Sequence, residues 1–235
     1  MDLTRDAIEK LVGLSEPHYL DHNGLKWSDK TMQVLDFDPR PATLEVATLT
    51  ALAHYITNGP DKLTLGDWLL HVEGPCSVAL VSKEGGLSHK RTTMIRAKMD
   101  LPGFAFGRDM DPETFIINLQ TMFEGAGDLA KILQLVGTMT TEAVQTSKDD
   151  GITQTVTARK GVALAENVRV PNPVTLAPFR TFRELEQPES LFVFRVKDGP
   201  KCALYEADGA AWKLETIQRI RDWFTTRISG LAVIA

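Results

Sequence analysis

The chain has 235 residues, of which 43% are hydrophobic and 24% are charged. A chain of this length buries about 70% of its unfolded surface on folding, so its core requires neither a metal ion nor a disulfide. This composition excludes the disordered, collagenous and membrane-spanning classes. The net charge of -5 argues against a protein whose whole surface binds nucleic acid.

The two cysteines, Cys76 and Cys202, lie far apart and outside any C-x-x-C or Cys/His cluster. We therefore expect two reduced thiols and no structural zinc site. Residues 1–14 lack the apolar segment of a signal peptide, and no stretch reaches the length of about 20 apolar residues that a spanning helix requires. These features predict a cytoplasmic protein that does not contact a membrane.

Residues 1–40 are predicted to form an N-terminal arm. Residues 4–13 have the pattern of a short surface helix, with Thr4 as its N-cap and Gly13 as its end. Asn23-Gly24 then lies between two segments that contain apolar residues. This dipeptide favours a β-hairpin, because both residues tolerate positive φ.

A proline-rich segment, Asp38-Pro39-Arg40-Pro41, follows the arm and is typical of a joint, because two prolines fix φ and remove two backbone donors. We expect residues 41–235 to form a single α+β domain. It opens with a strand at residues 43–46 and a helix that begins at Thr48. Glycine-containing turns then separate three strands that predict an antiparallel meander, at residues 68–73, 77–82 and 91–98.

A central helical pair is predicted next. Asp111-Pro112-Glu113 supplies an N-cap acceptor, a proline at the first helical position and an early carboxylate. Apolar residues then recur at helical spacing and predict a helix over residues 111–123. A second helix is predicted over residues 128–136, with Gly137 at its end.

The second half of the chain is rich in β-strand patterns. The expected strands cover residues 140–148, 152–160, 162–170, 174–179, 191–197 and 201–207. An amphipathic helix at 212–228 and a short apolar strand at 231–235 end the chain. The predicted fold is therefore α+β, with a mostly antiparallel sheet, packed helices, a central helical pair, and a C-terminal amphipathic helix followed by a short strand.

Two runs of residues in this half carry a resemblance. Leu191-Phe192-Val193-Phe194-Arg195-Val196-Lys197-Asp198-Gly199 is followed by Cys202-Ala203-Leu204-Tyr205-Glu206, a long helix and a short apolar end. This pattern resembles the YfdQ-like family of phage and prophage proteins, a domain of unknown function. The first half agrees in order, through Arg40-Pro41, the helix from Thr48, the meander and Asp111-Pro112-Glu113. The resemblance implies a phage-borne protein without an accepted active site, and the first 40 residues fit it less well.

Aromatic and basic residues alternate in one part of the predicted sheet: Phe179, Arg180, Phe182, Arg183, Phe192, Phe194 and Arg195. Such an arrangement would stack nucleic-acid bases or bind a small anionic ligand between arginines. The structural alternative is a strand whose phenylalanines lie in the core and whose arginines face solvent, and strand periodicity alone favours it. Phe179, Arg180, Phe182 and Arg183 are the ligand-binding candidates.

Candidate catalytic residues are few. Asp100, Asp109, Asp111 and Glu113 would supply a general acid and base, but helix capping already explains Asp111 and Glu113. His18 and His22 are four residues apart, yet a predicted extended chain does not bring them together on a metal ion. We therefore predict no catalytic residue, no cofactor and no metal site.

Three functional hypotheses follow. The first is a non-enzymatic protein that self-associates into a homo-oligomer, such as a ring or shell, through its hairpin and apolar tail. The expected contacts are Trp27, Leu231, Val233 and Ile234. The second is a protein that binds or sequesters a nucleotide or nucleic acid through the Phe/Arg segment. The third is a hydrolase that uses the acids near Asp109.

Overall fold

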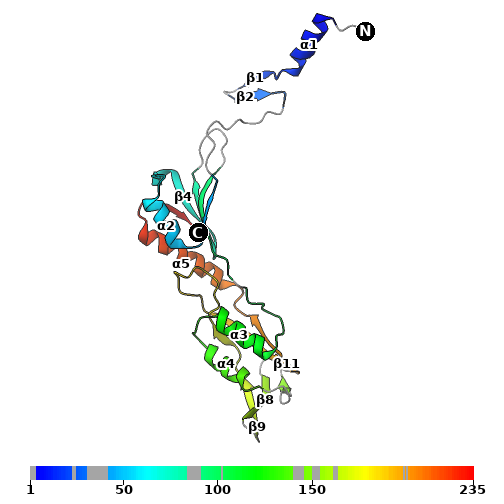
Figure 1. The fold of residues 1–235 in the computed structure, drawn as a ribbon, viewed down its shortest axis with the longest axis vertical. Helices are drawn as coiled ribbons and strands as arrows, with labels where there is room; N and C mark the ends of the chain where they lie inside the picture. The colour runs from blue at the N-terminus through cyan, green and yellow to red at the C-terminus, as the bar shows by residue number, and fades with distance from the viewer. Residues whose placement is uncertain are drawn as a thin grey trace. The chain divides into compact units, whose positions relative to one another are not determined.

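The computed structural model describes residues 4–22, 25–30, 42–83, 91–101, 103–139, 146–149, 154–160, 164–197, 199 and 201–235. The chain divides into two compact units, Met1–Pro41 (unit 1) and Ala42–Ala235 (unit 2). The described residues form helices and antiparallel-rich sheets (Figure 1), which confirms the α+β class.

Unit 1 contains helix α1 (Arg5–Ser15) and a hairpin of β1 (Tyr19–His22) and β2 (Leu25–Ser28). The strands pair antiparallel, as predicted, although Asn23 and Gly24 lie outside the described residues. The prediction that the helix stops at Gly13 was wrong. The residue before a proline is driven into an extended conformation, and Glu16 adopts one beside Pro17 and ends α1.

The first half of unit 2 is built on a five-stranded sheet in the order β13-β4-β5-β6-β3. Its strands are β3 (Leu44–Val46), β4 (Trp68–Gly74), β5 (Ser77–Ser82), β6 (Thr93–Lys98) and β13 (Ala232–Ile234). The predicted meander is present as β4, β5 and β6, and the 3-10 turn η1 (Leu65–Asp67) precedes it. The two edge strands are both parallel to their neighbours, which makes the sheet mixed.

Two helices cover this sheet, α2 (Leu49–Asn58) and α5 (Ala211–Arg227). Thr48 caps α2 as predicted, because its hydroxyl accepts a hydrogen bond from the Ala51 N–H at 3.1 Å. The side chains that form the first core of unit 2 include Leu49, Leu52, Ile56, Leu70, Leu80, Ile95, Ile220 and Phe224. Figure 1 shows both helices beside β4.

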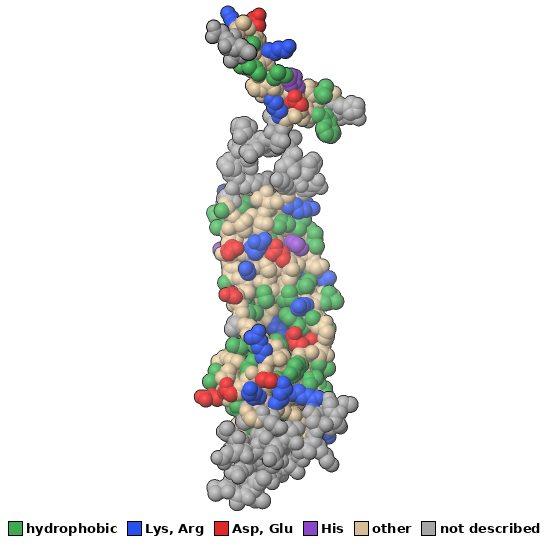
Figure 2. Space-filling model, turned by 90° about the vertical axis from the view of Figure 1, so that its right-hand side faces the viewer, with side chains coloured by type: hydrophobic (Ala, Val, Ile, Leu, Met, Phe, Trp, Pro, Cys, Tyr) green, Lys and Arg blue, Asp and Glu red, His purple; other side chains and the backbone are tan. Residues whose placement is uncertain are grey.

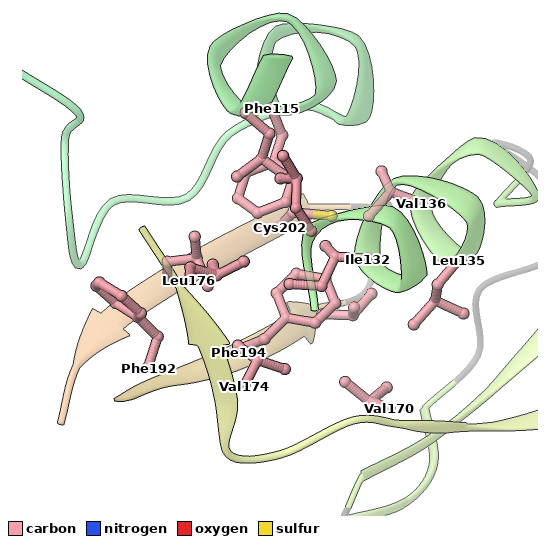
Figure 3. Packing of buried hydrophobic residues seen from close by; sticks show 14 of the residues in the cluster. Phe115, Ile132, Leu135, Val136, Val170, Val174, Leu176, Phe192, Phe194 and Cys202 are labelled. Carbon is pink, nitrogen blue, oxygen red and sulfur yellow. The ribbon is translucent and has the colours of Figure 1, made fainter. Parts of the chain in front are cut away.

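A second core lies between the central helical pair and a three-stranded antiparallel sheet. The helices are α3 (Pro112–Met122) and α4 (Leu129–Gly137), and the sheet order is β10 (Val174–Leu176), β11 (Ser190–Lys197) and β12 (Lys201–Glu206). Phe115 from α3 and Phe194 from β11 are fully buried and stacked, with ring centroids 5.5 Å apart. Figure 3 shows the helices directing their apolar side chains onto the strands.

The N-terminus of α3 has the predicted cap. The Asp111 carboxylate accepts the Thr114 N–H at 2.9 Å, and this backbone hydrogen bond lowers the pKa of Asp111. Asp128 does not cap α4. Its carboxylate instead accepts a hydrogen bond from the Thr175 N–H at 3.0 Å and forms an ion pair with Lys131 at 2.7 Å. Asp128 therefore connects α4 to β10.

A third sheet, also antiparallel, contains β7 (Thr146–Asp149), β8 (Gln154–Lys160) and β9 (Leu164–Val170). Gln154 is buried and joins this sheet to β11. Its carboxamide oxygen accepts the Val196 N–H at 2.9 Å, and its nitrogen donates to the Val196 carbonyl. Residues 140–145 of the first expected strand, and the first two residues of the expected strands at 152–160 and 162–170, lie outside the described residues.

Candidate functional site

The structure separates the four ligand-binding candidates. Arg180 is only 7% exposed and Phe182 is fully buried, which corrects the expectation that they line an accessible surface. Arg183 is exposed, and its guanidinium lies 3.7 Å from the centroid of the half-buried Phe179 ring. Of the four candidates, therefore, only the Arg183 guanidinium and the Phe179 ring are at least partly exposed.

Arg180 is held by groups that lie far along the chain. Its guanidinium pairs with Glu206 at 2.8 Å and donates to the Ser190 hydroxyl at 3.1 Å. It also lies 4.6 Å from the ring of Trp212 and 5.0 Å from the ring of Phe192. Burial lowers the pKa of Arg180, and the charges of Glu206 and Asp208 oppose that shift. The side chain is therefore a paired, buried cation.

The backbone around Arg180 connects the two cores of unit 2. The Cys76 thiol donates to the Arg180 carbonyl at 3.0 Å, and the Thr181 hydroxyl donates to the Pro75 carbonyl at 2.6 Å. Phe182 belongs to the core under α2 and α5, while Arg180 contacts Phe192 of the second core. We call residues 177–187 the junction segment, because they link these two parts of the fold.

Gln187 fixes the conformation of the junction segment. Its buried carboxamide oxygen accepts the N–H groups of Arg180 and Thr181, at 2.9 and 3.3 Å. Its nitrogen donates to the carbonyls of Phe182 and Leu185, at 3.3 and 3.2 Å. One side chain thus satisfies backbone groups that have no strand partner, which gives the junction segment a structural role.

The acids proposed for catalysis have other partners or face solvent. Asp109 pairs with Lys197 at 2.8 Å, Asp111 caps α3, and Asp100 and Glu113 are exposed. Within the described ranges, no group of three or more His, Cys, Asp or Glu side chains is placed to hold a metal ion. His18 pairs with Asp29, and the side chain of His22 lies outside the described atoms.

The apolar C-terminal tail forms the predicted strand, β13, which pairs in parallel with β4. Leu231 is only 8% exposed and packs in the first core of unit 2, so its proposed role as an oligomer contact is corrected to a core role. Val233 is half-buried against the same core. Ile234 is 52% exposed and remains available at the sheet edge.

Unit 1 exposes a large apolar surface. Twelve large hydrophobic side chains are exposed in the described part of the chain, and seven of them belong to unit 1. We define the apolar surface of unit 1 as these seven residues: Ile8, Leu11, Val12, Leu14, Tyr19, Leu20 and Trp27. None of the 11 residues of α1 is buried. Trp27, the hairpin contact predicted from the sequence, is 59% exposed.

The local structure groups these side chains by element. Ile8, Leu11 and Val12 recur at helical spacing and therefore share one face of α1. Leu20 and Trp27 are cross-strand partners in the hairpin, so they lie on the same face of the ribbon. Figure 2 shows hydrophobic side chains at the surface of this unit. Sequence reasoning identified the hairpin but missed the apolar face of α1.

Polar contacts link α1 to the end of the hairpin and join the two ends of the hairpin. The Lys30 ammonium donates to the Leu14 carbonyl at 2.9 Å, near the C-terminal end of α1. Asp29 accepts the His18 N–H at 2.8 Å, and its second oxygen lies 2.9 Å from His18 Nδ1. The backbone hydrogen bond from His18 is the main cause of the lowered pKa of Asp29. Unit 1 is therefore a defined element rather than a featureless tail.

Two of the pockets formed by described residues of unit 2 were not predicted by sequence reasoning. The larger has a volume of about 420 Å³ and lies between α2 and α5, where it is lined by His54, Glu184, Trp223 and Arg227 among others. No local signal marks it, because its residues come from α2, α5 and the junction segment, which are distant in sequence.

The second pocket has a volume of about 350 Å³ and is acidic, with Glu189, Asp208 and Glu215 in its lining. Burial raises the pKa of Asp208, but hydrogen bonds from Ser190 and the Ala210 N–H lower it overall. The buried indole nitrogen of Trp212 has no hydrogen-bond partner among the residues described.

Charges of both signs are mixed on the face that Figure 2 draws, and no single-sign patch dominates that view. In the described part of the chain, no helix is both long enough and apolar enough to cross a bilayer. Comparison with protein-family models, with curated proteins and with solved structures finds no match. The interpretation of the sites therefore depends on their geometry.

Proposed function

We propose that this chain is a non-enzymatic protein that assembles into a homo-oligomer through the apolar surface of unit 1. The observation that carries the proposal is the exposure of seven large hydrophobic side chains on Met1–Pro41. Burying a side chain of this size contributes about 1.5–3 kcal/mol relative to leaving it exposed, so a partner that covers several of them is strongly favoured.

The elements of unit 1 are too small to be stable when uncovered. Isolated helices shorter than about 12–15 residues are marginal in water, and α1 has 11 residues. An isolated two-stranded hairpin is marginal as well. Because packing of an amphipathic face supplies most of the stability of a helix in a protein, α1 and the hairpin require a covering surface.

The charges of α1 do not oppose a second copy of the chain as the partner. The charged residues of α1 are Arg5, Asp6, Glu9 and Lys10, whose formal charges sum to zero. Two copies of α1 therefore approach one another without net repulsion. Arg5 and Glu9 already pair at 2.9 Å, which shows that these side chains satisfy one another at the edge of the apolar face.

The apolar surface includes one helical face and one β face. If the helical face of one copy contacts the β face of the next, the interface is head-to-tail. Such interfaces form a closed ring when the rotation between neighbouring copies divides evenly into a full turn. A ring or shell is therefore the form of assembly we propose. The resemblance to the YfdQ-like phage and prophage family adds a phage origin and the bacterial cytoplasm to this proposal.

Light scattering coupled to size exclusion tests the proposal on the full chain. Leu11 is 56% exposed on α1 and Leu214 is 65% exposed on α5, so the two leucines are a matched pair. We expect Leu11→Glu to lower the particle mass, because it places a charge in the contact. Leu214→Glu, on unit 2, is expected to leave the mass unchanged.

Two outcomes would overturn the proposal. A wild-type chain that elutes as a monomer at micromolar concentration would show that another part of the same chain, or a different protein, covers the apolar surface. An oligomer that survives Leu11→Glu and dissociates with Leu214→Glu would place the contact on unit 2 instead.

A further inference from the structure

We propose that the groove between α2 and α5 binds a small organic anion through Arg227. The proposal is independent of oligomer formation, because it concerns a different surface on unit 2. The groove has a volume of about 420 Å³, which lies within the range of about 300–1,000 Å³ that is typical of small-molecule sites. One face of α2 contributes His54 and Thr57, and the end of α5 contributes Trp223 and Arg227.

Arg227 differs from the other two arginines of α5. Arg219 pairs with Glu215 at 2.7 Å, and Arg221 pairs with Asp222 at 2.9 Å. Among the residues described, Arg227 has no carboxylate within ion-pair distance, and its nearest acceptor is the Trp223 carbonyl at 3.2 Å. A permanent cation at the wall of a groove that forms no ion pair with the carboxylate in the same lining can accept an anionic ligand.

An aromatic ring orients this exposed cation toward the groove wall. The Arg227 guanidinium lies 4.2 Å from the centroid of the Trp223 ring. Trp223 in turn packs edge-on against Phe224, with centroids 4.8 Å apart, and Phe224 is fully buried. Guanidinium groups bind carboxylates and phosphates through two parallel N–H bonds, and a fixed orientation reduces the entropy lost on binding.

The carboxylate in the groove does not cancel the charge of Arg227. Glu184 accepts the Thr50 N–H at 3.1 Å, at the first turn of α2. The positive end of the helix dipole therefore compensates this carboxylate. The exposed His54 imidazole adds a hydrogen-bonding group to the same wall.

The ligand class follows from these groups. An oxyanion, either phosphate or carboxylate, matches the Arg227 fork. A planar ring beside that oxyanion would stack on the guanidinium, because arginine stacks on flat aromatic faces. The ligand is therefore a small molecule that carries both an oxyanion and a planar group.

Intrinsic tryptophan fluorescence tests the site on the full chain. The probes are adenosine 5′-monophosphate as the phosphate arm, benzoate as the carboxylate arm, and adenosine as the uncharged control. We expect saturable quenching with at least one anion and none with adenosine. Trp223→Phe is expected to remove this signal, which assigns it to the groove.

Arginine variants make the test specific. Loss of a charge-assisted hydrogen bond weakens binding by about tenfold or more, so Arg227→Gln is expected to raise the dissociation constant by that factor. Arg227→Lys keeps the positive charge but loses the paired N–H donors of the guanidinium, so we expect an intermediate increase in the dissociation constant. Arg221→Gln, on the same helix but outside the groove, is the matched control and is expected to bind normally.

Each result decides the proposal. Quenching by only one of the two anions would support the site and identify the oxyanion. Absence of saturation with both anions at millimolar concentration would overturn it. Equal loss of binding in Arg221→Gln and Arg227→Gln, with both variants folded by circular dichroism, would also overturn it.

Discussion

Alanine at Arg180 and alanine at Arg183 should have very different effects on the stability of the protein, although the two arginines are three residues apart. Arg180 is buried, pairs with Glu206 and donates to Ser190. Removing one partner of a buried ion pair costs about 3–5 kcal/mol. The Glu206 side chain is 41% exposed and regains water, so the lower end of this range, about 3 kcal/mol, applies.

Arg183 makes one contact that the substitution would remove, an exposed stack on Phe179. Such a contact at an exposed site contributes about 0.5–1 kcal/mol. For a domain of this size, 1 kcal/mol corresponds to about 2–4 °C in Tm. We therefore expect Arg180→Ala to lower Tm by about 6–12 °C and Arg183→Ala by about 1–4 °C.

Differential scanning calorimetry at one fixed protein concentration measures both shifts, and holding the concentration constant removes any contribution from assembly. Equal shifts for the two variants would refute the structural role of Arg180. A Tm that is unchanged in Arg180→Ala would likewise restore this side chain as a candidate for ligand binding.

Three further substitutions test local features of unit 2. Gly127 has φ of +62°, and a Cβ there would lie 2.3 Å from the Thr175 carbonyl oxygen. Gly127→Ala should therefore lower the free energy of unfolding, measured in urea, by about 2 kcal/mol or more. At Gly137 a Cβ meets no atom within 4 Å, so the control Gly137→Ala should be neutral or stabilising. Thr48→Ala removes the cap of α2 and should cost about 1 kcal/mol, whereas Thr48→Ser should preserve most of the stability. Folding lowers the pKa of Asp111. The ionised carboxylate therefore stabilises the fold above the pKa that Asp111 has in the unfolded chain, and this stabilisation is lost as the pH falls through its pKa in the folded state. Asp111→Asn keeps a capping side chain and should therefore flatten the acid limb of the stability curve; an unchanged acid limb would contradict this assignment.

Local sequence signals predicted the elements whose causes are local. The cap at Thr48 and the Asp111-Pro112 start of α3 are both present, because each depends on a few adjacent residues. Pro17, rather than Gly13, ends α1, since a helix tolerates glycine near its end but the residue before a proline leaves the helical conformation.

Long-range features escaped prediction. The edge strands β3 and β13 pair in parallel with strands that are not their neighbours in the sequence, and no local pattern specifies such a partner. The burial of Arg180 depends on Ser190, Glu206 and Trp212, which lie 10 or more residues away. Strand periodicity placed that arginine in solvent, and tertiary contacts overrode it.

The groove between α2 and α5 illustrates the same limit. His54 and Arg227 belong to two helices that the sequence predicts, from Thr48 and at 212–228, but the sheet beneath these helices sets the spacing between them. Sequence patterns therefore located the helices and not the groove.

Sedimentation velocity of the wild-type chain at micromolar concentration, across a tenfold dilution series, tests the central claim most directly. We expect one dominant species whose mass is two or more times 26.0 kDa, and conversion to smaller species when Leu11 and Trp27 are replaced together by Glu and Ala. A single species of 26.0 kDa throughout the series would contradict it.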